Sequence, residues 1–167
     1  REIVNLIHNV IYFTYKHRPK VVLTWAPHPK PLPHAVGNSF TRMMEYMDAD
    51  FVIAHPEGYS LNPAITKGVK SITNQEEALK EADFVYAKNW CSYEQYGQIL
   101  RADGEWMLTS KKMKLTNNGK FMHCLPIRRN VVAADKVLDS PNSLIIKQSE
   151  NRIYAAQVIL KQLLENG

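Results

Sequence analysis

Three cationic side chains stand just beyond short apolar runs, and their chemistry is that of anion binding. Lys88 follows the run 84–87, where burial makes a lysine costly unless an anion pairs with it. Arg128 and Arg129 follow the run 121–125 and a proline that would stop a strand. Two guanidinium groups at one strand end favour recognition of a phosphate or a carboxylate.

His28 and Arg152 are two further candidates for the same chemistry. His28 lies in the proline-rich segment 27–33, a stiff loop that could hold a hydrogen-bond donor in place. Arg152 is expected in the first turn of a final helix, 151–164, where a cation opposes the helix dipole unless an anion binds there. A surface arginine packed over Tyr154 is an equally good interpretation of Arg152.

His123 and Cys124 are neighbours that could suggest a nucleophilic thiol and its base. Consecutive strand residues point to opposite faces of a sheet, so a shared proton is disfavoured. The alternative role of Cys124 is that of a small buried hydrophobic residue. The other cysteine, Cys91, is distant in sequence, and the pair has the spacing of neither a disulfide framework nor a zinc site. A reducing compartment fits this cysteine usage best.

These side chains form a site only if a sheet brings them together. Short runs rich in Val, Ile and Phe predict strands at 21–25, 51–54, 69–72, 84–87, 121–125 and 144–146. Segments with a period of about 3.6 residues predict helices at 1–18, 33–47, 75–82, 93–100, 131–138 and 151–164. This alternation is typical of an α/β fold, a doubly wound, Rossmann-like parallel sheet with helices on both faces. Ligands of such sheets bind beyond the carboxyl ends of the strands.

The composition excludes several classes of protein. With 167 residues, 45% hydrophobic and 22% charged, the chain can bury a core as one globular domain. No run approaches the roughly 18 consecutive apolar residues of a membrane span. The net charge of +5 could favour nucleic acid, but the basic residues are scattered, and their densest cluster, 110–114, is predicted to be a solvated face. The dispersed glycines form neither a dinucleotide-binding turn nor a P-loop.

The run 121–130, with His-Cys-Leu-Pro at 123–126, resembles the signature of the ornithine carbamoyltransferase superfamily. The segments 24–33, 55–59 and 87–90 are most similar to the branch that acts on N-succinylornithine or N-acetylornithine. The resemblance implies a transcarbamoylase of two α/β domains, of which 19–167 would be the ornithine-binding domain and 1–18 an interdomain helix. The carbamoyl-phosphate domain and its Ser-x-Arg-Thr-Arg motif are missing here. Because the sequence starts at Arg1 without a leader, we expect part of a longer protein with no secretory signal.

The resemblance also implies roles for residues of this chain. Carbamoyl phosphate would contact the main chain of Cys124 and Leu125 and the side chain of Arg152. The acylated ornithine would contact three side chains, namely those of His28, Lys88 and Arg128. The implied reaction is direct carbamoyl transfer to the side-chain amine, giving N-acylcitrulline and phosphate in arginine biosynthesis, with no metal, no cofactor and no covalent enzyme intermediate. The implied enzyme is a cytoplasmic homotrimer that binds neither nucleic acid nor membrane, and this half alone is expected to be inactive.

The sequence departs from related branches at positions that bear on the acyl group. Lys88 replaces an acidic residue of ordinary ornithine carbamoyltransferases, and a cation there repels the free α-ammonium of ornithine. Val132 replaces a carboxylated lysine of the N-acetylornithine enzymes, so Lys88 would keep its full positive charge. These differences favour a succinyl group, which carries its own carboxylate. The alternatives are acetylornithine, free ornithine, or a non-catalytic α/β binding module.

Overall fold

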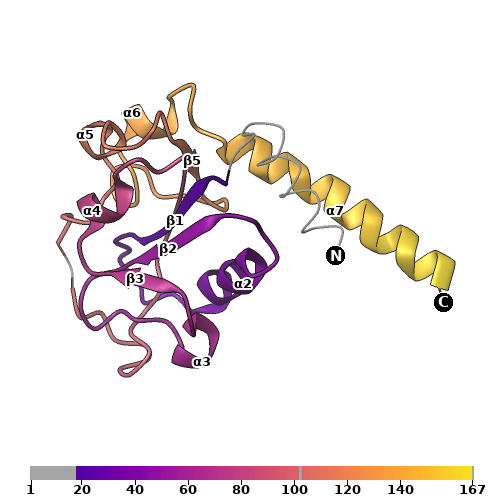
Figure 1. Cartoon of the computed structure of the whole chain (residues 1–167), viewed down its shortest axis with the longest axis horizontal. Helices are drawn as coiled ribbons and strands as arrows, with labels where there is room; N and C mark the ends of the chain where they lie inside the picture. Colours follow the sequence, from indigo (N-terminus) through magenta and orange to yellow (C-terminus); the bar gives the residue numbers. More distant parts are fainter. Residues whose placement is uncertain (1–17, 102, 167) are drawn as a thin grey trace.

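The computed structural model describes residues 18–101 and 103–166, and its centre is a parallel sheet (Figure 1). The strands lie in the order β3-β2-β1-β4-β5. Their bounds are β1 Lys20–Trp25, β2 Asp50–Ala54, β3 Lys70–Ile72, β4 Phe84–Lys88 and β5 Lys120–Met122. The helices are α2 Ala35–Met44, α3 Pro63–Thr66, α4 Gln75–Leu79, α5 Ser110–Met113, α6 Asp135–Leu138 and α7 Ile145–Asn166. The expected α/β class with a parallel sheet is confirmed.

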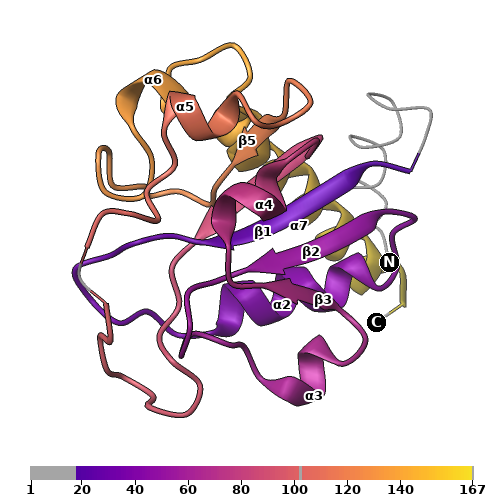
Figure 2. The same ribbon diagram turned by 60° about the vertical axis from the view of Figure 1, so that its left-hand side comes forward.

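Both faces of the sheet are covered, which explains the nearly continuous apolar strands. On one face, the Phe40 ring of α2 contacts the rings of Phe51 and Tyr86, with centroid distances of 5.9 and 4.6 Å. On the other face, Gln75 of α4 donates a 2.8 Å hydrogen bond to the Thr24 hydroxyl of β1. Figure 2 shows α2 and α4 on opposite sides of the central strands. The expected helices on both faces are therefore present.

Two predicted elements are wrong. The segment 144–146 is not a sixth strand, because pairing stops after the isolated bridge between Ser143 and Phe121 and α7 begins at Ile145. An apolar run this short fits either a strand or the start of a helix, and here the helical pattern that follows decides. The segment 93–100 is an exposed loop rather than a helix, and Gly97, at φ +82°, interrupts any helical path.

Other boundaries move by several residues. The strand predicted at 121–125 is β5 and ends at Met122, while the helix predicted at 131–138 is α6 and begins at Asp135. The helices predicted at 33–47 and 75–82 are the shorter α2 and α4. Sequence patterning missed α3 and α5, which are only four residues long each. The helix predicted at 1–18 lies almost wholly outside the described residues.

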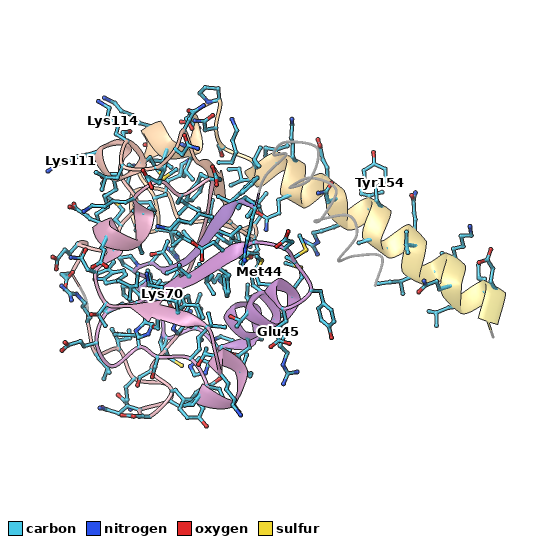
Figure 3. All side chains as sticks on the ribbon, viewed as in Figure 1. Met44, Glu45, Lys70, Lys111, Lys114 and Tyr154 are labelled. Atoms are coloured by element: carbon cyan, nitrogen blue, oxygen red, sulfur yellow. The ribbon has the colours of Figure 1, made fainter. Side chains whose placement is uncertain are left out.

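Helix α7 leaves the sheet beside β5 and extends away from it (Figure 1). It begins six residues earlier than its predicted start at 151. Its large apolar side chains are exposed, namely those of Ile146, Ile153, Tyr154, Ile159, Leu160, Leu163 and Leu164. Tyr154 projects from the middle of the helix, whereas Lys111 of α5 and Lys114 just after it point outward at the far corner of the domain (Figure 3). In the part of the chain that the structure describes, no helix is long and apolar enough to cross a membrane.

Candidate functional site

A pocket of about 260 Å³ lies where the loops after β1, β4 and β5 meet. Its lining includes His28, Lys88, His123, Arg128 and Val132. Strand β1 pairs with β2 on one side and with β4 on the other. The strands that follow β1 in the chain are therefore added first to one side of it, as β2 and β3, and then to the other side, as β4 and β5. This is the switch point at which open α/β sheets bind ligands. The structure therefore brings together the three side chains predicted to hold the acylated ornithine.

His28 and Arg128 contact each other across the mouth of this pocket. The Arg128 Nε–H donates to His28 Nε2 at 3.3 Å, and His28 Nδ1 lies 3.0 Å from the Lys30 carbonyl oxygen. The Lys30 backbone N–H also donates to His28 Nδ1 at 3.1 Å, so the main chain at Lys30 holds the imidazole ring on its Nδ1 side. Among the described residues, the two Nη groups of Arg128 have no protein partner. They can therefore receive a carboxylate from a ligand.

Lys88 is the last residue of β4 and is half-buried beside the pocket. Its backbone is fixed, because it pairs in register with Trp25 and its carbonyl accepts from the Ala26 N–H at 3.1 Å. Within residues 18–101 and 103–166, no carboxylate forms an ion pair with its ammonium group. A half-buried cation without a protein counter-ion is well placed to bind an anionic ligand.

Arg129 does not share this role, which corrects the expectation of two guanidinium groups at one site. Its Nη1 atom donates to Asp135, the first residue of α6, at 2.8 Å, and its Nη2 atom donates to Asp139, which directly follows α6, at 2.6 Å. Asn130 turns the chain at φ +57° and bonds Asp135 through its own side chain. Arg129 holds the pKa of both aspartates below their usual value. The two neighbouring arginines thus have separate tasks, since only Arg128 reaches the pocket.

The residues predicted to contact carbamoyl phosphate are not gathered in this pocket. Cys124 and Leu125 form the segment that leads from β5 to the pocket wall at Pro126. Arg152 is exposed, and it is the eighth residue of α7 rather than part of its first turn. The helix-dipole argument for Arg152 is therefore wrong, because the N-terminal amides lie about two turns away.

His123 is a pocket residue that sequence reasoning missed, although its place between β5 and Pro126 was a usable signal. It is 3% exposed, and its Nδ1 contacts the main-chain oxygen of Cys124 rather than the thiol. This contact supports the expectation that the two residues form no thiol–base pair. The Cys124 thiol lies instead against the Tyr86 hydroxyl, whose pKa is raised first by burial and then by this neighbour.

The charge state of His123 makes stability depend on pH. Burial and then the Lys88 ammonium lower the pKa of His123 from 6.5 to about 4. Between these values the unfolded chain binds a proton that the folded chain does not, so the free energy of unfolding falls as the pH drops from 6.5 to 4. We expect this one group to contribute about 3 kcal/mol across the window. Urea denaturation followed by circular dichroism at pH 4 to 7 measures it.

His123→Asn is the informative variant, because an amide can keep the bond to the Cys124 oxygen without titrating. The variant should lose stability less steeply than the parent protein as the pH falls. Burial also lowers the pKa of His55, which contributes in the same direction, so a His55→Asn variant measures that part separately. Parallel curves for His123→Asn and the parent protein would contradict the assignment.

Comparison with known proteins places this geometry in a family. Residues 34–163 match the family model described as aspartate/ornithine carbamoyltransferase, Asp/Orn binding domain. The chain is 53% identical over 150 residues to N-succinylornithine carbamoyltransferase of Bacteroides thetaiotaomicron, covering 89% of this chain and 47% of that protein. It is 37% identical over 163 residues to N-acetylornithine carbamoyltransferase of Xanthomonas campestris, covering 87% of this chain and 48% of that protein.

The fold is also that of solved relatives. The structure of an acetylornithine transcarbamylase complexed with acetylcitrulline superimposes with a TM-score of 0.81 at 32% identity, covering 94% of this chain and 53% of that one. The chain thus spans about half the length of the curated relatives it matches. The chain belongs to the aspartate/ornithine carbamoyltransferase family and corresponds to its Asp/Orn-binding domain.

Proposed function

We propose that this chain is the substrate-binding half of a carbamoyltransferase that acts on an N-acylated ornithine. The observation that supports this most is the pocket at the switch point, where Lys88 from the end of β4 meets His28 and Arg128 from the loops after β1 and β5. Anionic groups of an acylated amino acid match such a lining. Relatives named for succinylornithine and acetylornithine point to the same class of substrate.

Within this class, a succinyl group fits the pocket better than an acetyl group. Val132 is apolar and 2% exposed where it lines the pocket, so it offers no charge to neutralise Lys88. The Lys88 ammonium is therefore matched by a ligand that brings an additional carboxylate. The same ammonium repels the α-ammonium of free ornithine. N-succinylornithine is accordingly the proposed substrate.

The proposed reaction is direct transfer between two aligned reactants. The unprotonated side-chain amine attacks the carbamoyl carbon, the bond from that carbon to the phosphate oxygen breaks, and the amine gives up a proton to the departing phosphate as N-acylcitrulline forms. Main-chain groups at Cys124 and Leu125, together with Arg152, would stabilise the oxyanion and the departing phosphate. The chain's own residues need no covalent bond to the substrate, so Cys124 would be a contact residue.

The proposal extends to the longer protein of which this chain would be half. That protein would be a homotrimer acting in the cytoplasm in arginine biosynthesis, and its first domain would bind carbamoyl phosphate. The exposed position of Arg152 on α7 supports this division, because α7 extends away from the sheet and leaves Arg152 open to a second domain (Figure 1). The 167-residue chain alone would bind its amino-acid ligand weakly and catalyse nothing.

Calorimetric titration tests the proposal. The longest natural form of the protein is saturated with carbamoyl phosphate and titrated with N-succinyl-, N-acetyl- and unmodified L-norvaline, which lack the reactive amine. A transcarbamylase variant complexed with carbamyl phosphate and N-succinyl-L-norvaline shows that a relative accepts such a probe. We expect the succinyl compound to bind most tightly. Preference for the acetyl compound would overturn the argument from Val132, and no binding by any of them would favour a non-catalytic binding module.

A further inference from the structure

The loop that carries His28 has few hydrogen bonds of its own. Pro27, Pro29 and Pro31 supply no backbone N–H, so the segment 26–32 cannot be held by a regular ladder. Its bonds instead reach across to the segment after β4. The Cys91 N–H donates to the Leu32 carbonyl at 2.8 Å.

Asn89 joins both ends of this loop at once. Its Nδ2 donates to the Ala26 carbonyl at 2.7 Å, and its Oδ1 accepts from the Leu32 N–H at 3.4 Å. Asn89 is 4% exposed and follows Lys88 directly, so its backbone position is set by β4. One buried amide therefore ties the start and the end of the His28 loop to the strand that carries Lys88.

We infer that Asn89 is a positioning residue that sets the distance between His28 and Lys88 across the pocket. Without it, each end of the segment 26–32 keeps one main-chain bond to the region of β4, from Ala26 N–H to the Lys88 carbonyl and from Cys91 N–H to the Leu32 carbonyl, and a single bond at each end leaves the loop free to pivot. A shift of the loop would move the His28 imidazole, and with it the Arg128 guanidinium that donates to His28 Nε2. The inference rests on the proposed function, because it assigns Asn89 to the same acylornithine pocket.

A buried asparagine also stabilises the fold, so the test must separate positioning from stability. Gln75 supplies the matched control, because it is a buried amide that bonds Thr24 and the Trp106 carbonyl and does not line the pocket. Both Asn89→Ala and Gln75→Ala should lose stability in urea. Only Asn89→Ala should weaken binding of N-succinyl-L-norvaline to the carbamoyl-phosphate-saturated full-length protein, by roughly tenfold.

A double-mutant cycle with His28→Ala shows whether Asn89 acts through His28. If it does, Asn89→Ala weakens binding in the parent protein and has almost no effect in the His28→Ala background. In turnover, the KM for the acylated ornithine should rise while kcat stays within about twofold, as expected for lost ground-state binding. An equal penalty in both backgrounds would mean that Asn89 touches the ligand itself, and it would overturn the inference. So would unchanged binding in Asn89→Ala or an equal loss in Gln75→Ala.

These failures are distinguishable from failure of the proposed function. If the proposed function is wrong, the parent protein binds none of the three norvaline compounds, and the double-mutant cycle has no parent affinity with which to compare the variants. If the parent protein binds the succinyl compound but the cycle is additive, the proposed function stands and the role of Asn89 falls.

Discussion

Replacing Lys88 by methionine is expected to weaken binding of N-succinyl-L-norvaline by about one to two orders of magnitude, the range for loss of a hydrogen bond to a charged group. Methionine keeps most of the apolar stem, so the change removes the ammonium and little packing. The loss should be much smaller for N-acetyl-L-norvaline, which has no second carboxylate. Calorimetric titration of the full-length protein with saturating carbamoyl phosphate compares the two ligands directly.

Lys114→Met is the matched control for Lys88→Met. Lys114 is exposed just after α5 at the far corner of the domain, so its replacement should leave both affinities unchanged (Figure 3). An equal loss for the succinyl and acetyl compounds in Lys88→Met would show that Lys88 binds the α-carboxylate common to both. That result would keep Lys88 in the site and remove it from acyl-group selection.

Leu23→Ala should produce the largest loss of stability among these variants, about 3 kcal/mol in the free energy of unfolding. Leu23 is 0% exposed at the centre of β1, paired in register with Ile53 of β2 and Tyr86 of β4. Its removal leaves a cavity in the middle of the sheet, where the neighbouring strands cannot move in to fill it. Urea denaturation of the 167-residue chain, followed by circular dichroism, measures the change.

Leu164→Ala makes the same chemical change on the surface. Leu164 is 76% exposed on α7, and alanine is at least as good a helix former, so stability should change by no more than about 0.5 kcal/mol. A loss in Leu164→Ala as large as that in Leu23→Ala would mean that α7 packs against the domain in solution. A loss below about 1 kcal/mol in Leu23→Ala would contradict the placement of Leu23 in the core.

Sequence reasoning found the sheet and most of the pocket for a physical reason. Parallel strands buried on both faces must be almost wholly apolar, so β1, β2 and β4 stand out from their surroundings. Residues just after such strands gather at one edge of the sheet. Lys88, His28 and the pair of Arg128 and Arg129 were therefore recognisable from position alone, while the resemblance to the carbamoyltransferases singled out Arg128 from the pair.

The errors arose where side-chain direction or a long-range partner decides the outcome. Nothing in the run Arg128-Arg129 indicates which arginine faces the pocket, because Asn130 turns the chain and α6 supplies the competing carboxylates. Arg152 was misplaced because the start of α7 depends on where pairing with β5 stops. The place of His123 just after β5 was a usable signal for the pocket, whereas the effect of the Lys88 charge on its pKa comes from another strand, and no local pattern reveals it.

The burial of every tryptophan in the chain has a practical consequence. Trp25, Trp90 and Trp106 are at most 5% exposed, and the Trp25 indole donates to the main-chain oxygen of Trp90 at 2.8 Å. The Trp90 indole in turn donates to the Tyr59 carbonyl at 2.7 Å, and Trp90 directly follows Asn89, which lines the pocket. The tryptophan fluorescence of the chain therefore originates in its buried interior, and Trp90, next to a residue of the pocket, gives the molecule an optical reporter close to the ligand site without any added label.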